Sequence, residues 1–147
     1  MKKIALIENF AEDFVNSRLR YALYLKKNGY DVYAIIPQSE LSKEMVCAGI
    51  KVIQTNGDPR NRSTLDVFYY AIILWKIFKR EKFDIIHLYR LQPNLIGSFV
   101  ARLSSKKSLI INHITGLGFA FTSKKLSYLF LQEFNKIIRV TNNKDIF

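Results

Sequence analysis

Short apolar runs alternate with longer helix-like segments along this chain, and only a few residues connect one to the next. The first run, residues 4–7, is continuously apolar, which is typical of a strand covered on both faces. Strands that alternate with helices indicate crossover connections and therefore a parallel sheet. The sequence predicts an α/β fold with a parallel sheet of about six strands, at residues 4–7, 32–36, 50–54, 85–89, 109–114 and 137–140.

Helix-like segments fill the intervals between these strands, so we expect a Rossmann-like three-layer sandwich. The first helix spans residues 13–28, and Gly29 follows it as a residue that adopts the left-handed conformation easily. Its apolar stripe consists of Val15, Leu19, Ala22 and Leu23. The other expected helices lie at residues 41–48, from Ser63 or Thr64 to Arg80, and at residues 94–104 and 124–134.

Length and charge bound the classes of partner. The 147 residues make one domain, and 23 Lys and Arg against 12 Asp and Glu give a net charge of +11. Such a charge favours anionic partners. The basic residues are scattered over all segments without a recognition module, so no nucleic acid is expected. The single cysteine, Cys47, excludes an internal disulfide framework, and we expect it to be a small buried residue.

The apolar segments are too short to span a membrane. The run after Met1-Lys2-Lys3 covers only residues 4–7, so no secretory signal is expected, and residues 67–75 fall short of the roughly 20 that a spanning helix needs. We expect a cytoplasmic protein, either soluble or peripheral at the inner face of the membrane. Residues 65–78 are nearly all apolar, which leaves two interpretations: a core helix, or a surface against lipid or a partner. The positive charges of Lys106, Lys107, Lys124 and Lys125 would attract the protein to anionic lipid.

Three loops are expected to meet where the strand order reverses. In such sheets the first and fourth strands are neighbours there, and ligands bind off their carboxyl ends. The loops are residues 8–16, 87–94 and 113–123. The first loop contains no glycine, which disfavours NAD or FAD binding. Two histidines and one cysteine without metal-type spacing predict no metal site.

Residues 112–123, with the core Thr115-Gly116-Leu117-Gly118, resemble the strand-end loop in the N-terminal domain of family-four glycosyltransferases. Thr115 stands where many members of that family have histidine. Five further segments are similar to family elements in the same order. They are Phe14-Val15-Asn16-Ser17-Arg18-Leu19, Lys27-Asn28-Gly29-Tyr30-Asp31-Val32, Ile36-Pro37-Gln38, Lys82-Phe83-Asp84-Ile85-Ile86-His87 and Pro93-Asn94-Leu95-Ile96-Gly97-Ser98.

The resemblance implies a glycosyltransferase of the two-Rossmann-domain (GT-B) type. Family members transfer sugar from a nucleotide sugar, with retention and without a tightly held metal, to lipid-linked or polysaccharide acceptors in capsule, O-antigen or glycan biosynthesis. On this expectation residues 1–147 form the single N-terminal, acceptor-side domain, and the C-terminal nucleotide-sugar domain is absent from this chain. The chain alone would then be inactive, because transfer needs both reactants in one cleft.

The resemblance also implies partners and site residues. No cofactor is expected beyond the nucleotide-sugar co-substrate, which the missing domain would mainly bind. Expected partners are the nucleotide sugar, a saccharide acceptor, an anionic membrane surface and a separate donor-domain subunit. An alternative is a non-enzymatic membrane-recruitment or binding subunit for such a donor subunit. The expected substrate-binding residues are Asn16, Arg18, His87, Asn94, His113, Thr115, Gly116 and Gly118, and no catalytic residue is identified.

Three of these residues have plausible chemistry of their own. Arg18 could donate a forked pair of hydrogen bonds to phosphate or carboxylate, or it is a solvated helix arginine. His87 could bind a sugar hydroxyl or act as an acid or base, or it is a satisfied core histidine. His113 alternates with Thr115 along one strand, so both are expected to face the same side.

Overall fold

The computed structural model describes residues 1–56, 64–105 and 107–114. These residues belong to one compact unit, Met1–Ile114. Several predictions fall outside the described residues: the helix at 124–134, the strand at 137–140, and the site residues Thr115, Gly116 and Gly118.

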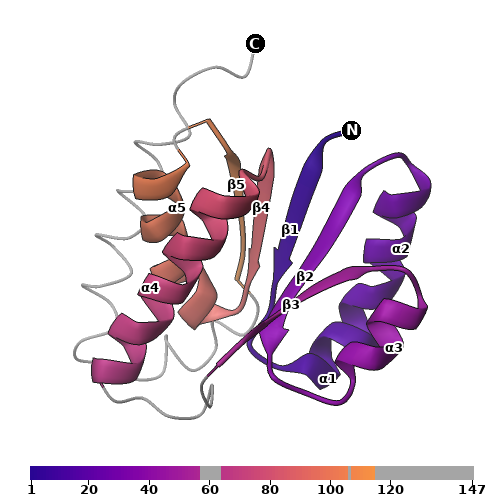
Figure 1. Ribbon diagram of the computed structural model, residues 1–147, viewed down its shortest axis with the longest axis horizontal. Coiled ribbons are helices and arrows are strands. Elements are labelled where there is room, and N and C mark those ends of the chain that lie inside the picture. The colour runs from indigo at the N-terminus through magenta and orange to yellow at the C-terminus, as the bar shows by residue number, and fades with distance from the viewer. Residues whose placement is uncertain (57–63, 106, 115–147) are drawn as a thin grey trace. The chain divides into compact units, whose positions relative to one another are not determined.

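The described part of the chain forms a five-stranded parallel sheet (Figure 1). Its strands are β1 (Lys3–Ile7), β2 (Asp31–Pro37), β3 (Lys51–Thr55), β4 (Ile85–Tyr89) and β5 (Leu109–His113). The order β3-β2-β1-β4-β5 confirms the predicted α/β class and makes the first and fourth strands neighbours. In the register, Leu6 of β1 lies between Ala34 of β2 and His87 of β4.

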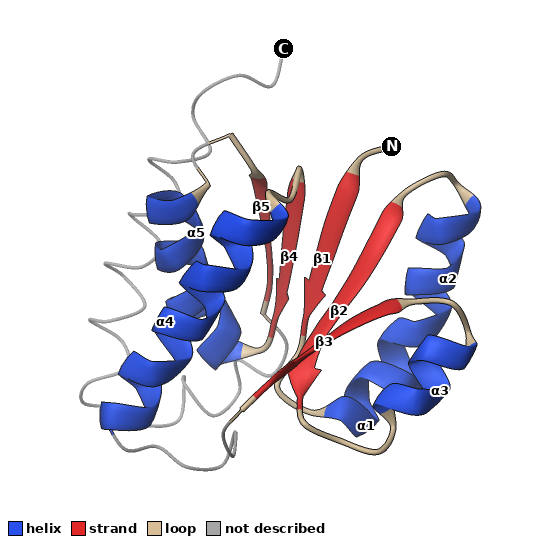
Figure 2. Cartoon of the chain, viewed as in Figure 1, coloured by secondary structure: helices blue, strands red, loops and turns tan. Residues whose placement is uncertain are grey.

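Helices cover both faces of this sheet (Figure 2). One face carries α1 (Ala11–Asp13), the π-helical segment η1 (Phe14–Arg18), α2 (Leu19–Lys27) and α3 (Ser42–Cys47). The other carries α4 (Thr64–Glu81), the π-helical segment η2 (Pro93–Gly97) and α5 (Ser98–Ser104). This confirms the three-layer prediction for the described residues.

The central strand contributes to both cores. Ile4 and Leu6 pack with the α1–α3 layer, whereas Ala5 and Ile7 pack with the α4–α5 layer. All four side chains are buried, which explains why the run of residues 4–7 is continuously apolar rather than alternating.

The predicted apolar stripe of the first helix is wrong at Leu23, which is exposed. The buried positions are Phe14, Ala22 and Leu25. The physical reason is η1: a π-helical turn closes its hydrogen bonds over five residues, so the phase of the helix shifts relative to regular α-helical spacing.

The expectation of a buried Cys47 is also wrong, because its thiol is exposed. Cys47 is the last residue of α3, and Met45 occupies the inward position of that helix. Two residues further along an α-helix the side chain points to the opposite side, away from the sheet.

Two glycines have conformations or contacts that favour the absence of a side chain. Gly29 has φ +85° at the end of α2, as predicted from the sequence. Gly97 ends η2, and a Cβ there would lie 2.6 Å from Cδ2 of Leu88 in β4. Gly97 therefore lets η2 lie close to β4, at the strand edge that carries the candidate site.

Helix α4 is apolar on two sides. Leu74, Ile77 and Phe78 pack into the core, as the core interpretation predicts. An opposite stripe is exposed and consists of Leu65, Phe68, Ile72 and Trp75. None of the described helices is both long and apolar enough to cross a bilayer.

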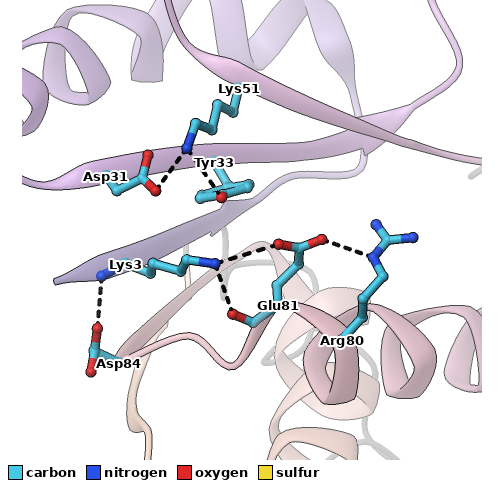
Figure 3. Close-up of polar contacts among 7 residues, drawn as sticks. All are labelled: Lys3, Asp31, Tyr33, Lys51, Arg80, Glu81 and Asp84. Atoms are coloured by element: carbon cyan, nitrogen blue, oxygen red, sulfur yellow. Dashed lines mark hydrogen bonds and ion pairs between the residues drawn. The ribbon is translucent and has the colours of Figure 1, made fainter. Parts of the chain in front are cut away.

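Charged residues at the amino ends of the strands pair with one another (Figure 3). The Lys3 backbone N–H donates to Asp84 Oδ2 at 2.7 Å, and Lys51 Nζ lies 2.8 Å from Asp31 Oδ2. Glu81 lies between Lys3 and Arg80. Such solvent-exposed pairs contribute little to stability. The charged side chains named here therefore find partners within the described part of the chain.

Candidate functional site

The carboxyl ends of β1, β4 and β5 hold a polar cluster at the point where the strand order reverses. Glu8 directly follows β1, and its N–H donates to the Ile35 carbonyl at 3.1 Å. Arg90 directly follows β4, and its N–H donates to the carbonyl of His113 at 3.2 Å. The sheet hydrogen bonding therefore continues one residue beyond each strand and fixes where both side chains begin.

Glu8 joins two arginines from different elements. Its side chain is 0% exposed, and Oε1 lies 2.9 Å from Arg90 Nε and accepts the Asn9 N–H at 3.1 Å. Oε2 lies 3.8 Å from Arg18 Nε. Burial raises the pKa of Glu8, because the charged form loses hydration, while the Asn9 N–H and the two arginines oppose this shift.

Arg90 occupies a backbone conformation that is uncommon for a side-chain-bearing residue, with φ +64°. Besides Glu8, its guanidinium pairs with Asp13 and lies 4.9 Å from the ring centroid of Phe10. These contacts offset the roughly 1–2 kcal/mol cost of the left-handed conformation. Arg90 thus pairs with two carboxylates, and 42% of its side chain remains exposed.

Arg18 is held differently. It is the last residue of η1, and its guanidinium carbon lies 4.3 Å from the ring centroid of Tyr89. Its side chain is 20% exposed, and its Nε is buried without a hydrogen-bond partner. π-Helical turns are frequent at functional sites, and this one ends at Arg18.

His87 and Tyr89 stack on one another beside Arg18. Their ring centroids are 4.2 Å apart, and the Tyr89 hydroxyl shares a hydrogen bond of 3.1 Å with His87 Nδ1. The His113 ring lies 5.3 Å from that of Tyr89. Burial lowers the pKa of His87 to about 4, helped by His113 and Arg18, so its imidazole is neutral at pH 7. Burial likewise raises the pKa of Tyr89, so its phenol stays protonated.

Asn94 ties the ends of β4 and β5 together. Its Nδ2 donates to the carbonyl of Arg90 and, at 3.1 Å, to the carbonyl of His113. The residue is buried, and its Oδ1 has no hydrogen-bond partner. Its amide group therefore contributes two donors to the scaffold and leaves one acceptor unused.

All buried side-chain polar atoms that lack a hydrogen bond in the described residues lie in this cluster. They are Glu8 Oε2, Arg18 Nε, His87 Nε2 and Asn94 Oδ1. Leaving such a group unsatisfied costs about 1–3 kcal/mol. Because each of these costs falls at one strand edge, the arrangement is typical of a site kept for function rather than for stability.

The structure brings together Arg18, His87, Asn94 and His113, four of the residues predicted from the sequence. Asn16 is exposed, and its side chain makes no hydrogen bond or ion pair with the described residues. Glu8, Tyr89 and Arg90 also belong to this cluster and were not predicted as site residues from the sequence. Their position in the sequence could have indicated them, because each residue ends or directly follows a predicted strand at the point where the strand order reverses.

The described residues include no group of three or more His, Cys, Asp or Glu side chains arranged to hold a metal ion. The cluster consists of hydrogen-bond donors and acceptors together with the rings of His87, Tyr89 and His113.

The sequence matches the model of a family described as glycosyl transferase 4-like over residues 3–144. The chain belongs to the glycosyl transferase 4-like family. This agrees with the resemblance noted in the sequence. In the structure, Glu8 and Arg90 lie at the strand edge where ligands of such sheets bind.

Two solved structures have the same fold as this glycosyl transferase 4-like chain. A glycosyltransferase from Rickettsia africae ESF-5 matches with a TM-score of 0.58 and 19% identity over 86% of the chain. MurG from Acinetobacter baumannii matches with a TM-score of 0.60 and 14% identity over 90% of the chain. The chain spans 34% and 39% of these two proteins. No curated protein matches it.

The stability of the protein is expected to fall as the pH drops from 6.5 toward 4, because His87 must stay neutral when folded. Its folded pKa of about 4 lies below the unfolded value of 6.5, so the unfolded chain takes up the proton first. Between pH 7 and pH 5 this linkage removes about 2 kcal/mol. Urea unfolding of wild type and His87→Phe at both pH values measures this change in unfolding free energy. The variant should lack the contribution of about 2 kcal/mol that His87 makes.

The matched control for this measurement is His113→Asn. This variant keeps His87, so its free energy of unfolding should still fall between pH 7 and pH 5 by most of the wild-type amount. Equal losses in wild type and His87→Phe would show that His87 does not carry this pH dependence.

Proposed function

We propose that this chain is the acceptor-side domain of a GT-B glycosyltransferase. In this proposal the enzyme transfers sugar with retention from a nucleotide sugar to a lipid-linked or polysaccharide acceptor, in capsule, O-antigen or glycan biosynthesis. The observation that carries the proposal is the polar cluster of Glu8, Arg18, His87 and Asn94 at the reversal point of a glycosyl transferase 4-like sheet.

The chemistry of the cluster suits a saccharide. Hydroxyl groups both donate and accept hydrogen bonds, and the cluster offers both kinds of partner. Its four unpaired atoms are shielded from solvent, so a ligand meets the cluster through exposed side chains. These include His113 and Tyr21, whose ring centroid lies 6.0 Å from that of His87. In the proposal, Asn16, Arg18, His87, Asn94 and His113 position the acceptor, together with Thr115, Gly116 and Gly118.

The donor is proposed to bind mainly to a second Rossmann-like domain. The loop after β1 begins Glu8-Asn9-Phe10 and has no glycine-rich phosphate cradle, which supports this division. Catalysis would then require both domains, without a further cofactor, and the chain alone would be inactive.

The outer side of α4 supports a membrane-presented acceptor. Its exposed stripe of Leu65, Phe68, Ile72 and Trp75 continues into Lys79, with Lys76 and Arg80 beside it. Apolar and aromatic side chains followed by basic ones favour the surface of an anionic membrane. We propose that this stripe lies against the cytoplasmic face of a membrane. The alternative function, a membrane-recruitment subunit for a separate donor subunit, draws on the same stripe.

Saturation-transfer NMR on the 147-residue chain tests the proposed function. Neutral and acidic oligosaccharides are the acceptor probes, and UDP-glucose and GDP-mannose are the donor probes. We expect saccharides to bind and nucleotide sugars not to compete with them. His113→Ala should weaken saccharide binding about tenfold, the loss of one hydrogen bond at the exposed edge of the site. Tyr24→Ala, on the exposed side of α2, is the control and should change nothing.

Two outcomes would contradict the proposal: sugar transfer by the purified chain alone, or binding of nucleotide sugars in preference to saccharides. Flotation with vesicles of phosphatidylglycerol and phosphatidylcholine distinguishes the acceptor-side domain from the alternative, a membrane-recruitment subunit. A chain that floats with these vesicles but binds no saccharide would support a recruitment subunit instead.

A further inference from the structure

The guanidinium of Arg18 has unused hydrogen-bonding capacity. An arginine carries five N–H donors. No hydrogen bond within the described part of the chain uses any of those on Arg18, and its one ion pair, with Glu8, spans 3.8 Å. That distance is too long for a hydrogen bond.

Arg90 shows what a satisfied guanidinium in this cluster looks like. It lies 2.9 Å from Glu8 and also pairs with Asp13. Both carboxylates of the cluster therefore contact Arg90, and only the more distant oxygen of Glu8 faces Arg18. Arg18 therefore shares Glu8 with Arg90 and lies no closer than 3.8 Å to its carboxylate.

Arg18 is nevertheless held in place. Its guanidinium carbon lies over the Tyr89 ring, 4.3 Å from the ring centroid, and the buried Oε2 of Glu8 attracts its Nε. A guanidinium held over an aromatic ring is pre-organised, so little freedom is lost when its remaining donors bind a ligand. With 20% of the side chain exposed, part of Arg18 remains accessible.

We propose that Arg18 binds an oxyanion on the acceptor, a phosphate or carboxylate group, and that Glu8 and Tyr89 are positioning residues that hold it. This inference rests on the proposed function and adds that the acceptor is anionic where it meets the switch point of the sheet. An oxyanion is the group that can accept two parallel hydrogen bonds from a guanidinium and also brings a negative charge to it. A sugar hydroxyl supplies neither.

The side-chain NMR signal of Arg18 Nε–H tests this inference on the 147-residue chain. The probes are inorganic phosphate, methyl glucuronide as a carboxylate, and methyl glucoside as a neutral sugar. About 0.15 M salt suppresses weak binding to the many exposed lysines. We expect one or both anions to shift the Arg18 signal, and methyl glucoside to leave it unchanged. The anion that binds more tightly identifies the source of the charge.

Variants distinguish anion binding at Arg18 from anion binding caused by the general positive charge of the chain. Arg18→Met should weaken anion binding about 10- to 100-fold, as expected for the loss of charge-assisted hydrogen bonds. Arg18→Lys should be intermediate, because it keeps the charge and loses the fork. Arg20→Met, the next arginine on the same helix and exposed, is the matched control and should bind like wild type.

The inference is overturned if Arg18→Met and Arg20→Met bind the anions equally well, if methyl glucoside shifts the Arg18 signal as strongly, or if neither anion binds. If neutral oligosaccharides bind but neither anion shifts the Arg18 signal, the inference is refuted and the proposed function still stands. If no saccharide binds at all, the proposed function fails as well.

Discussion

Replacing Phe14 by alanine is expected to lower the free energy of unfolding by about 3–5 kcal/mol. The ring of Phe14 is 0% exposed and packs in the core between the sheet and α1–α3. Its removal leaves a cavity that the surrounding side chains fill only in part. The carbonyl of Phe14 also accepts the Leu19 N–H that closes the π-helical turn, so the same change should loosen Arg18.

Urea unfolding measures the loss in stability, and the Arg18 Nε–H signal reports the loosening of the site. Phe99→Ala is the matched control, because Phe99 is 68% exposed on α5 and its truncation should change stability by less than about 0.5 kcal/mol. Phe14→Leu, which fills most of the space, should cost about 1 kcal/mol. If Phe14→Ala cost no more than Phe99→Ala, the first turns of this helix would not depend on the core as the structure indicates.

The sheet could be predicted from the sequence because strand burial leaves a direct mark on composition. Residues 4–7 are apolar at every position since both faces of β1 are covered. The strand at residues 85–89 was predicted with its observed bounds, Ile85–Tyr89, and ends where Arg90 leaves the sheet. The alternation of strands and helices then determines a parallel sheet with β1 beside β4.

The details of helix phase could not be predicted in the same way. A π-helical turn shifts the buried positions without adding or removing apolar residues, so Leu23 fits the expected stripe as well as Leu25 does. Cys47 was misjudged for a related reason, since its neighbour Met45 is the residue that reaches the core. Apolar spacing predicts that a helix has a buried face, and packing selects which residues form it.

The candidate site was predictable to the level of its loops. Topology brings the ends of β1, β4 and β5 together, and therefore Arg18, His87 and His113. The roles of Glu8 and Arg90 were not predictable, because a charged residue after a strand resembles any solvated loop residue. Only the packed structure shows that Glu8 is buried between two arginines.

Replacing Asn94 by aspartate is expected to destabilise the protein at pH 7 by about 3–5 kcal/mol, more than replacement by alanine at about 2–3 kcal/mol. Alanine removes the two hydrogen bonds to the carbonyls of Arg90 and His113. Aspartate adds a buried charge that faces those two carbonyl oxygens. The control is Asn112→Asp, because Oδ1 of Asn112 accepts from the Ser98 hydroxyl at 2.6 Å and aspartate keeps that acceptor.

The pH dependence separates the donor role of Asn94 from a purely steric one. Burial against carbonyl oxygens must raise the folded pKa of an aspartate at position 94 above its unfolded value of about 4. Such a group stabilises below the unfolded pKa, and this stability is lost as the pH rises through the folded pKa. Urea unfolding should therefore show Asn94→Asp approaching Asn94→Ala in stability near pH 4, since a protonated carboxyl can donate to one carbonyl. A constant difference between the two variants from pH 4 to pH 7 would mean that these carbonyls do not face residue 94, and that the link between β4 and β5 lies elsewhere.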